Sequence, residues 1–145
     1  MINPQSQVSA ELYIQAARAA VWQKFIRLPE WPDWQPAVQA AQWTDGGTAG
    51  GWQEGAHFQI TQGQQVLHGV IRMVATESVT VWEVMDPALN AVYALHCTDQ
   101  LGGCKVTLRY TVNGMRVLLF WLQRGRRQRQ LSATLEALKA HVERR

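Results

Sequence analysis

The C-terminal segment from Met115 to Arg145 reads as one long helix, and its apolar side chains need a surface to cover. One stripe of this helix carries apolar residues at the spacing i, i+4, i+7 and i+11: Leu131, Leu135, Leu138 and Val142. Traced backwards at about 100° per residue, the stripe passes through Arg127 and Arg124 and then reaches Phe120. Because a buried unpaired charge is costly, this part of the stripe either faces water or meets an anion.

The rest of the chain is mostly strand, with a helical region near its start. Alternation of apolar and polar residues predicts seven strands, over 7–14, 38–44, 56–61, 66–76, 78–85, 89–98 and 104–113. Between the first two strands we expect a helix over 16–28, stopped by Pro29, and a short helical turn ending at Pro36. Consecutive strands that are joined by a short turn, such as the one at Gly102-Gly103, pair antiparallel. The sequence therefore predicts a single α+β domain over 1–145, with a curved seven-stranded antiparallel sheet wrapped around the long C-terminal helix.

Charge and apolar content exclude several classes of protein. Six of the fourteen basic residues are arginines at 124, 126, 127, 129, 144 and 145, and without them acidic residues outnumber basic ones. No basic stripe for nucleic acid is visible, so we expect no nucleic-acid partner. No apolar run reaches the length of a membrane span, and the first residues lack the apolar core of a signal peptide. We expect a cytoplasmic protein that does not span a membrane.

The two cysteines, Cys97 and Cys104, flank a turn-like segment and could lie on neighbouring strands. A cross-strand disulfide is conceivable, but in a reducing cytoplasm we expect two free, buried thiols. Two cysteines without paired histidines make a poor zinc site, and we expect no metal and no cofactor.

Three local motifs, taken with the order of elements, resemble one known superfamily. They are AVWQKFI over 20–26, LPEWPDWQP over 28–36 and LEALKAHVE over 135–143, with a glycine-rich stretch over 45–55 between the second and third strands. Together they resemble the START-like superfamily, also called SRPBCC or helix-grip proteins, and most of all its polyketide cyclase/dehydrase and lipid-transport branch. The resemblance spans nearly the whole chain and implies a deep, mainly apolar cavity between the sheet and the long helix. It transfers no catalytic residue, because fold does not fix function.

We expect aromatic side chains from several elements to line this cavity, although plain core packing would use the same residues. The predicted cavity residues are Trp34, Trp43, Phe58, Met73, Trp82, Tyr93, His96, Tyr110, Phe120, Arg124 and Arg127. The two arginines would bind a carboxylate or phosphate at the end of the cavity. The alternative is that Gly125 kinks the helix and leaves its arginines in solvent. His57 and His68 should point outward by alternation, whereas the orientation of His96 stays open.

Three functions are compatible with these features. The first is binding, with or without transport, of a small hydrophobic ligand such as a lipid, fatty acid or polyketide-like molecule. The second is a cyclase/dehydrase-type enzyme, in which His96, Tyr93 or an arginine polarises a carbonyl. The third is a partner-binding module that uses the start of the C-terminal helix. Leu118, Leu119 and Leu122 lie off the stripe there, and a homodimer contact, a membrane surface, or the short second helix or a loop would cover them. The sequence does not identify the ligand.

Overall fold

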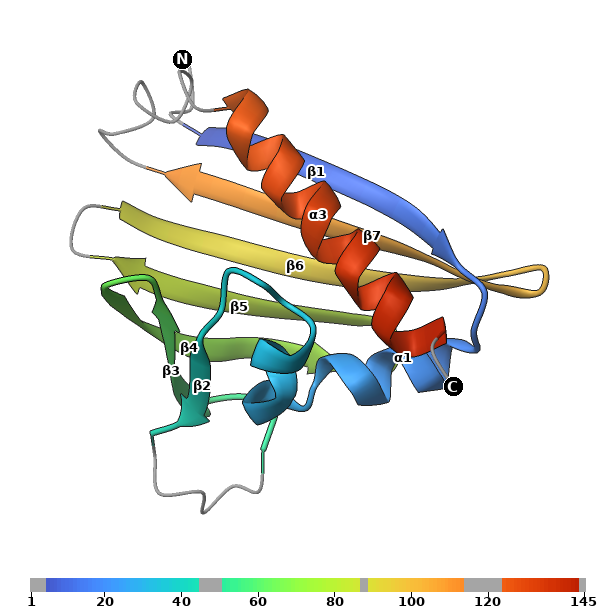
Figure 1. The fold of residues 1–145 in the computed structure, drawn as a ribbon, viewed down its shortest axis with the longest axis horizontal. Helices are drawn as coiled ribbons and strands as arrows, with labels where there is room; N and C mark the ends of the chain where they lie inside the picture. Colours follow the sequence, from blue (N-terminus) through green and yellow to red (C-terminus); the bar gives the residue numbers. More distant parts are fainter. Residues whose placement is uncertain (1–4, 45–50, 87–88, 114–123, 144–145) are drawn as a thin grey trace.

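Seven antiparallel strands form one curved sheet, with a long helix lying across one face (Figure 1). The structure is a computed structural model that describes residues 5–44, 51–86, 89–113 and 124–143. The strands follow the order β1-β7-β6-β5-β4-β3-β2. Their bounds are β1 Gln5–Ile14, β2 Ala40–Trp43, β3 His57–Gln62, β4 Gln65–Ala75, β5 Val79–Asp86, β6 Leu89–Gln100 and β7 Gly103–Asn113. The helices are α1 Arg18–Phe25, the 3-10 helix η1 Leu28–Asp33 and α3 Arg124–Glu143. The helix-grip architecture expected from the sequence is confirmed.

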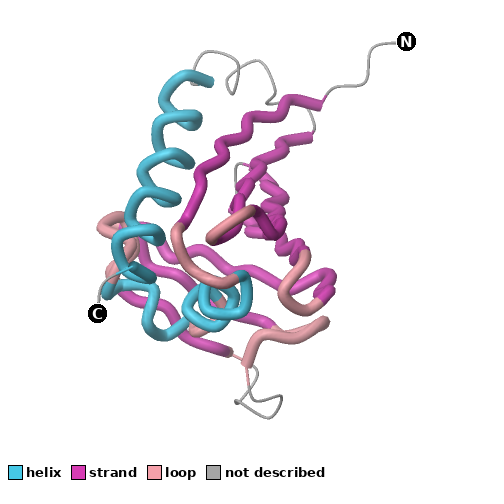
Figure 2. Tube along the Cα trace, turned by 90° about the vertical axis from the view of Figure 1, so that its right-hand side faces the viewer, coloured by secondary structure: helices cyan, strands magenta, loops and turns pink. Residues whose placement is uncertain are grey.

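The long helix α3 packs on β1, β7 and α1 through the predicted apolar stripe (Figure 2). Leu131, Leu135 and Leu138 are buried, and Val142 is half-buried. Hydrogen bonds hold both ends of α3 beside β1. Near the start of the helix, Gln128 donates a hydrogen bond to the carbonyl of Ser9. At its end, Glu143 accepts a hydrogen bond of 2.8 Å from the backbone N–H of Gln15, the residue after β1. None of the described helices combines the length and apolar character needed to cross a membrane.

A proline separates α1 from η1 and makes the first helix shorter than the predicted 16–28. In a continuous helix the N–H of residue 29 would donate to the carbonyl of Phe25, but Pro29 has no N–H. The indole Nε1 of Trp31 donates to that carbonyl instead, at 2.8 Å. This bond fixes Trp31 beside Phe25, with ring centroids 5.3 Å apart. The short helical turn expected around Trp31 and Trp34 is thus present as η1, and the Trp31 hydrogen bond holds it against the end of α1.

A β-bulge in β4 reverses the alternation that the sequence suggested. Ile71 pairs with Trp82 and Met73 pairs with Val81, which leaves Arg72 without a partner residue in the ladder. The buried Thr80 hydroxyl supports the bulge by donating to the carbonyl of Met73 at 2.9 Å. As a result Val74 turns toward the core, and Met73 is 39% exposed.

The two cysteines are buried and free, which agrees with the expectation from the sequence. Burial raises the pKa of the Cys97 thiol to about 12, and the neighbouring Cys104 contributes in the same direction. Gly102 adopts the positive φ of +82° expected for the hairpin turn between them.

Candidate ligand cavity

A cavity of about 270 Å³ lies between the concave face of the sheet and α3. Strands β3 to β7 contribute one wall, which includes Ile60, Trp82 and Leu108. Helix α3 contributes a second wall through one face of its first half, and the segment from η1 to Val38 contributes a third. Most of the lining side chains are apolar or aromatic, as in many small-molecule sites.

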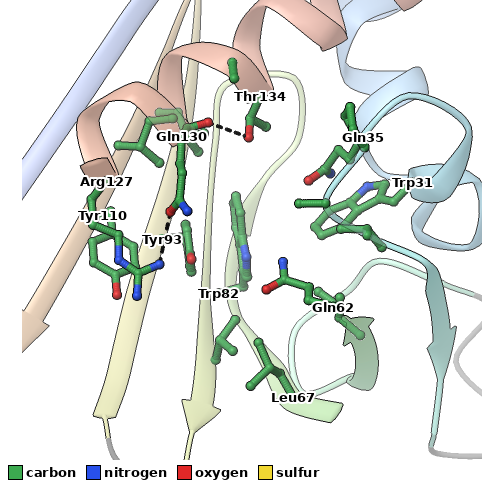
Figure 3. A pocket seen from close by; sticks show the side chains of 18 of the residues that line it. Trp31, Gln35, Gln62, Leu67, Trp82, Tyr93, Tyr110, Arg127, Gln130 and Thr134 are labelled. Carbon is green, nitrogen blue, oxygen red and sulfur yellow. Dashed lines mark hydrogen bonds between the residues drawn. The ribbon is translucent and has the colours of Figure 1, made fainter. Parts of the chain in front are cut away.

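Polar side chains stand at two sides of this apolar space (Figure 3). On the α3 side, Arg127 Nη1 donates to Oε1 of Gln130 at 3.1 Å, and the guanidinium carbon lies 5.3 Å from the centre of the Tyr110 ring. Gln35 and Gln62 line the cavity near Trp31, across from the arginine. The cavity therefore offers a cation at one side and two neutral amides at the other.

Three aromatic rings on neighbouring strands form the wall between these polar groups. Trp82 and Tyr93 stack almost parallel, with an interplanar angle of 5° and centroids 5.4 Å apart. Tyr110 meets Tyr93 edge-on, with centroids 4.9 Å apart. Burial raises the pKa of Tyr93 above its ordinary value, Tyr110 adds to this, and Arg127 partly opposes it. The Tyr93 phenol is therefore neutral at physiological pH.

Four of the predicted cavity residues line this space: Trp82, Tyr93, Tyr110 and Arg127. They come from β5, β6, β7 and α3, so antiparallel pairing and the helix stripe bring together residues far apart in the sequence. Phe120 lies outside the described residues. The backbone of Arg124 begins α3, but its side chain also lies outside what the structure describes.

Three other predicted residues, Trp34, Trp43 and Phe58, pack in the adjoining core and not in the cavity lining. The Phe58 ring lies directly on Gly69, where an added Cβ would come within 2.2 Å of the ring. Trp43 meets Phe58 edge-on at 6.2 Å, and Trp34 stacks on His141 at the same centroid distance. Core packing, the alternative reading of the aromatic residues, accounts for these three.

Met73 and His96 point away from the cavity, contrary to their selection as cavity residues. The bulge in β4 accounts for Met73, as described above. On β6 the buried side chains are Ala91, Leu95 and Cys97, so alternation directs His96 to the opposite face, where it pairs with Thr107. Burial and, to a smaller extent, Arg109 lower the pKa of His96. Within the described part of the chain, no three His, Cys, Asp or Glu side chains are grouped as metal ligands would be.

Several cavity residues were not predicted, above all the polar residues Gln35, Gln62 and Gln130. Two of them carried a signal in the sequence. Gln62 continues the alternation of Phe58 and Ile60 on β3, and Gln130 lies three residues after Arg127 on the same helix face. No comparable pattern marks Gln35, because its position depends on the proline-rich segment around it.

An open antiparallel sheet, a long C-terminal helix and an internal cavity define this chain as a helix-grip protein. Its sequence matches the family model for polyketide cyclase/dehydrase and lipid transport over residues 5–143, so the chain belongs to that family, within the START-like or SRPBCC superfamily. A comparison with curated protein sequences finds no match.

Several solved structures share this fold. The di-domain ARO/CYC StfQ from the steffimycin biosynthetic pathway matches with a TM-score of 0.77 and 14% identity, over 96% of this chain and 51% of that chain. A hypothetical protein from Helicobacter pylori matches with a TM-score of 0.82 and 11% identity, over 95% and 88% of the two chains. Norcoclaurine synthase from Thalictrum matches with a TM-score of 0.74 and 11% identity, over 98% and 96%. This chain spans about half the length of StfQ, and at these identities the likeness establishes the fold alone.

Proposed function

We propose that this protein binds a small, mostly apolar ligand in the cavity between the sheet and α3, such as a lipid, a fatty acid or a polyketide-like molecule. The observation that carries the proposal is the cavity itself, with about 270 Å³ of space and a mainly apolar and aromatic lining. Ligand pockets commonly measure roughly 300–1,000 Å³, so this volume favours a compact ligand. Reversible exchange of such a ligand would suit a carrier.

The ionisable groups of the cavity favour binding over catalysis. Among the described residues that line it, only Tyr93, Tyr110 and Arg127 can ionise. General acid–base catalysis needs a group whose pKa lies near the working pH, and the pKa of Tyr93 is raised away from that range. His96, which the cyclase hypothesis would use, lies on the opposite face of the sheet. Binding is therefore the function that we propose.

A neutral fluorescent probe, N-phenylnaphthylamine, tests the proposal directly. We expect the wild-type protein to bind it and T134W to lose this binding, because Thr134 lines the cavity and an indole there would fill the space. The matched control is S132W, which adds the same indole to an exposed position on the same helix, outside the cavity lining. Equal binding by the two variants would place the probe elsewhere and contradict the proposal. Native mass spectrometry of freshly purified protein would identify any ligand that stays bound.

A further inference from the structure

Arg127 places a positive charge at the edge of an otherwise apolar cavity. Its side chain is half-buried and lines the cavity from the first half of α3. The ion pairs formed among the described residues are Arg18–Asp99, Arg27–Glu30, Arg72–Glu83, Lys105–Glu11 and Lys139–Glu143, and none of them involves Arg127. No Asp or Glu side chain contributes to the described cavity lining. The described residues therefore supply no negative charge to this arginine inside the cavity.

Two neighbours hold the guanidinium in place without neutralising it. Gln130 accepts one hydrogen bond from Nη1 at 3.1 Å, and the guanidinium lies over the face of the Tyr110 ring. A guanidinium carries five N–H donors, so most of them are left for another acceptor. The planar fork of these donors fits two oxygens of one oxyanion.

The surroundings of Arg127 suit an anion and disfavour a cation. Tyr93 stays protonated because burial raises its pKa, so it presents a neutral phenol to the cavity. The exposed Arg126 and Arg129 lie on the same turns of α3 and add positive potential near this end. Apolar walls, here Leu108 and Leu131, strengthen an electrostatic interaction because they keep water away from it.

We propose that the ligand carries one oxyanionic group, a carboxylate or an equivalent acid, and that Arg127 binds it at the α3 side of the cavity. The inference rests on the proposed function and specifies the ligand class for that same site. The apolar body of the ligand lies against Trp82 and Tyr93, and its far end approaches Gln35 and Gln62, whose amides suit a hydroxyl or a carbonyl.

A pair of fluorescent probes separates the charge from the apolar body. Anilinonaphthalene sulfonate and N-phenylnaphthylamine share one aromatic skeleton, and only the first carries an oxyanion. We expect R127Q to weaken sulfonate binding about tenfold, the loss typical of one charge-assisted hydrogen-bonded contact, and to leave neutral-probe binding unchanged. The matched control is R126Q, which removes the same charge from an exposed neighbouring residue outside the cavity lining. It should leave neutral-probe binding unchanged and weaken sulfonate binding by no more than about twofold, because a solvent-exposed charge outside the cavity adds only a small attraction.

A second variant keeps the test decisive if R127Q also disturbs the fold. R127K retains the charge but loses the planar fork, so its sulfonate affinity should fall between wild type and R127Q, with the neutral probe still bound. Equal sulfonate affinities for R127Q, R127K and R126Q, with the neutral probe bound by all three, would overturn this inference and leave the proposed function intact. If the wild-type protein bound neither probe, the proposed function would fail and this inference with it.

Discussion

Along α3, the stripe that carries Leu135 and Leu138 is buried in the core, whereas two to three turns earlier the same stripe carries Arg127 and lines a cavity. The later stretch, Leu131 to Val142, holds the helix on the sheet. The earlier stretch, Arg124 to Gln130, carries exposed arginines at 126 and 129 and turns polar groups toward the cavity. Helical periodicity thus determines which face of a helix turns toward the sheet. It does not determine whether protein side chains or a ligand fill the space there.

The largest change in stability should come from shortening a buried side chain in the later stretch. Leu138 is fully buried, so L138A should lower the free energy of unfolding by about 2–5 kcal/mol through lost burial and the cavity left behind. Denaturant unfolding followed by tryptophan fluorescence measures this change. At low denaturant the folded variant should still bind the neutral probe, because Leu138 does not line the ligand cavity.

The control for L138A is the same substitution at a residue with no burial. Leu101, at the tip of the β6–β7 hairpin, is 100% exposed, and L101A should change the stability by less than about 0.5 kcal/mol. If L138A and L101A lowered the free energy of unfolding by similar amounts, burial of Leu138 would not explain its contribution to stability.

The side-chain directions that the structure shares with the sequence analysis depend on local periodicity. The stripe of α3 and the inward side chains of β5 and β7, such as Trp82 and Tyr110, follow from spacing alone. Met73 points in a different direction from the one that alternation suggests, because a single bulge residue, Arg72, shifts the alternation. The Thr80 hydroxyl that supports the bulge lies on another strand, where local spacing does not reveal it. Similarly, Gln35 reaches the cavity through a segment shaped by prolines, which has no period to read.

A smaller change, this time a gain in stability, should come from a substitution in the earlier stretch. Gly125 lies within α3, and a Cβ added there would meet only the end of the Arg129 side chain, at 3.7 Å. G125A should therefore stabilise the protein by about 0.5–1 kcal/mol, because alanine loses less backbone entropy than glycine in a helix. Thermal or denaturant unfolding would detect the gain.

Gly63 provides the matched control for G125A. A Cβ at Gly63 would meet no atom within 4 Å, but its φ of +61° is a conformation that alanine rarely adopts. G63A should therefore destabilise the protein, by about 1 kcal/mol. If both substitutions shifted stability in the same direction, backbone conformation would not be the cause.

The smallest effect concerns the end of the later stretch, where Glu143 accepts hydrogen bonds from Lys139 Nζ at 2.5 Å and from the backbone N–H of Gln15 at 2.8 Å. These bonds, that from Lys139 first, lower the pKa of Glu143 below its ordinary value of 4.5. Because the folded-state pKa is the lower one, the stabilisation is complete above pH 4.5 and disappears as the pH falls through the folded-state value.

E143Q should therefore be less stable than wild type at pH 7, and the two should converge as the medium is acidified below pH 4.5. Unfolding curves across this range measure the difference. The matched control is E136Q, which removes an exposed carboxylate from the same helix and should change the stability at pH 7 by less than about 0.5 kcal/mol. A difference between E143Q and wild type that stayed constant with pH would mean that the carboxylate does not help to hold this end of α3 on the turn after β1.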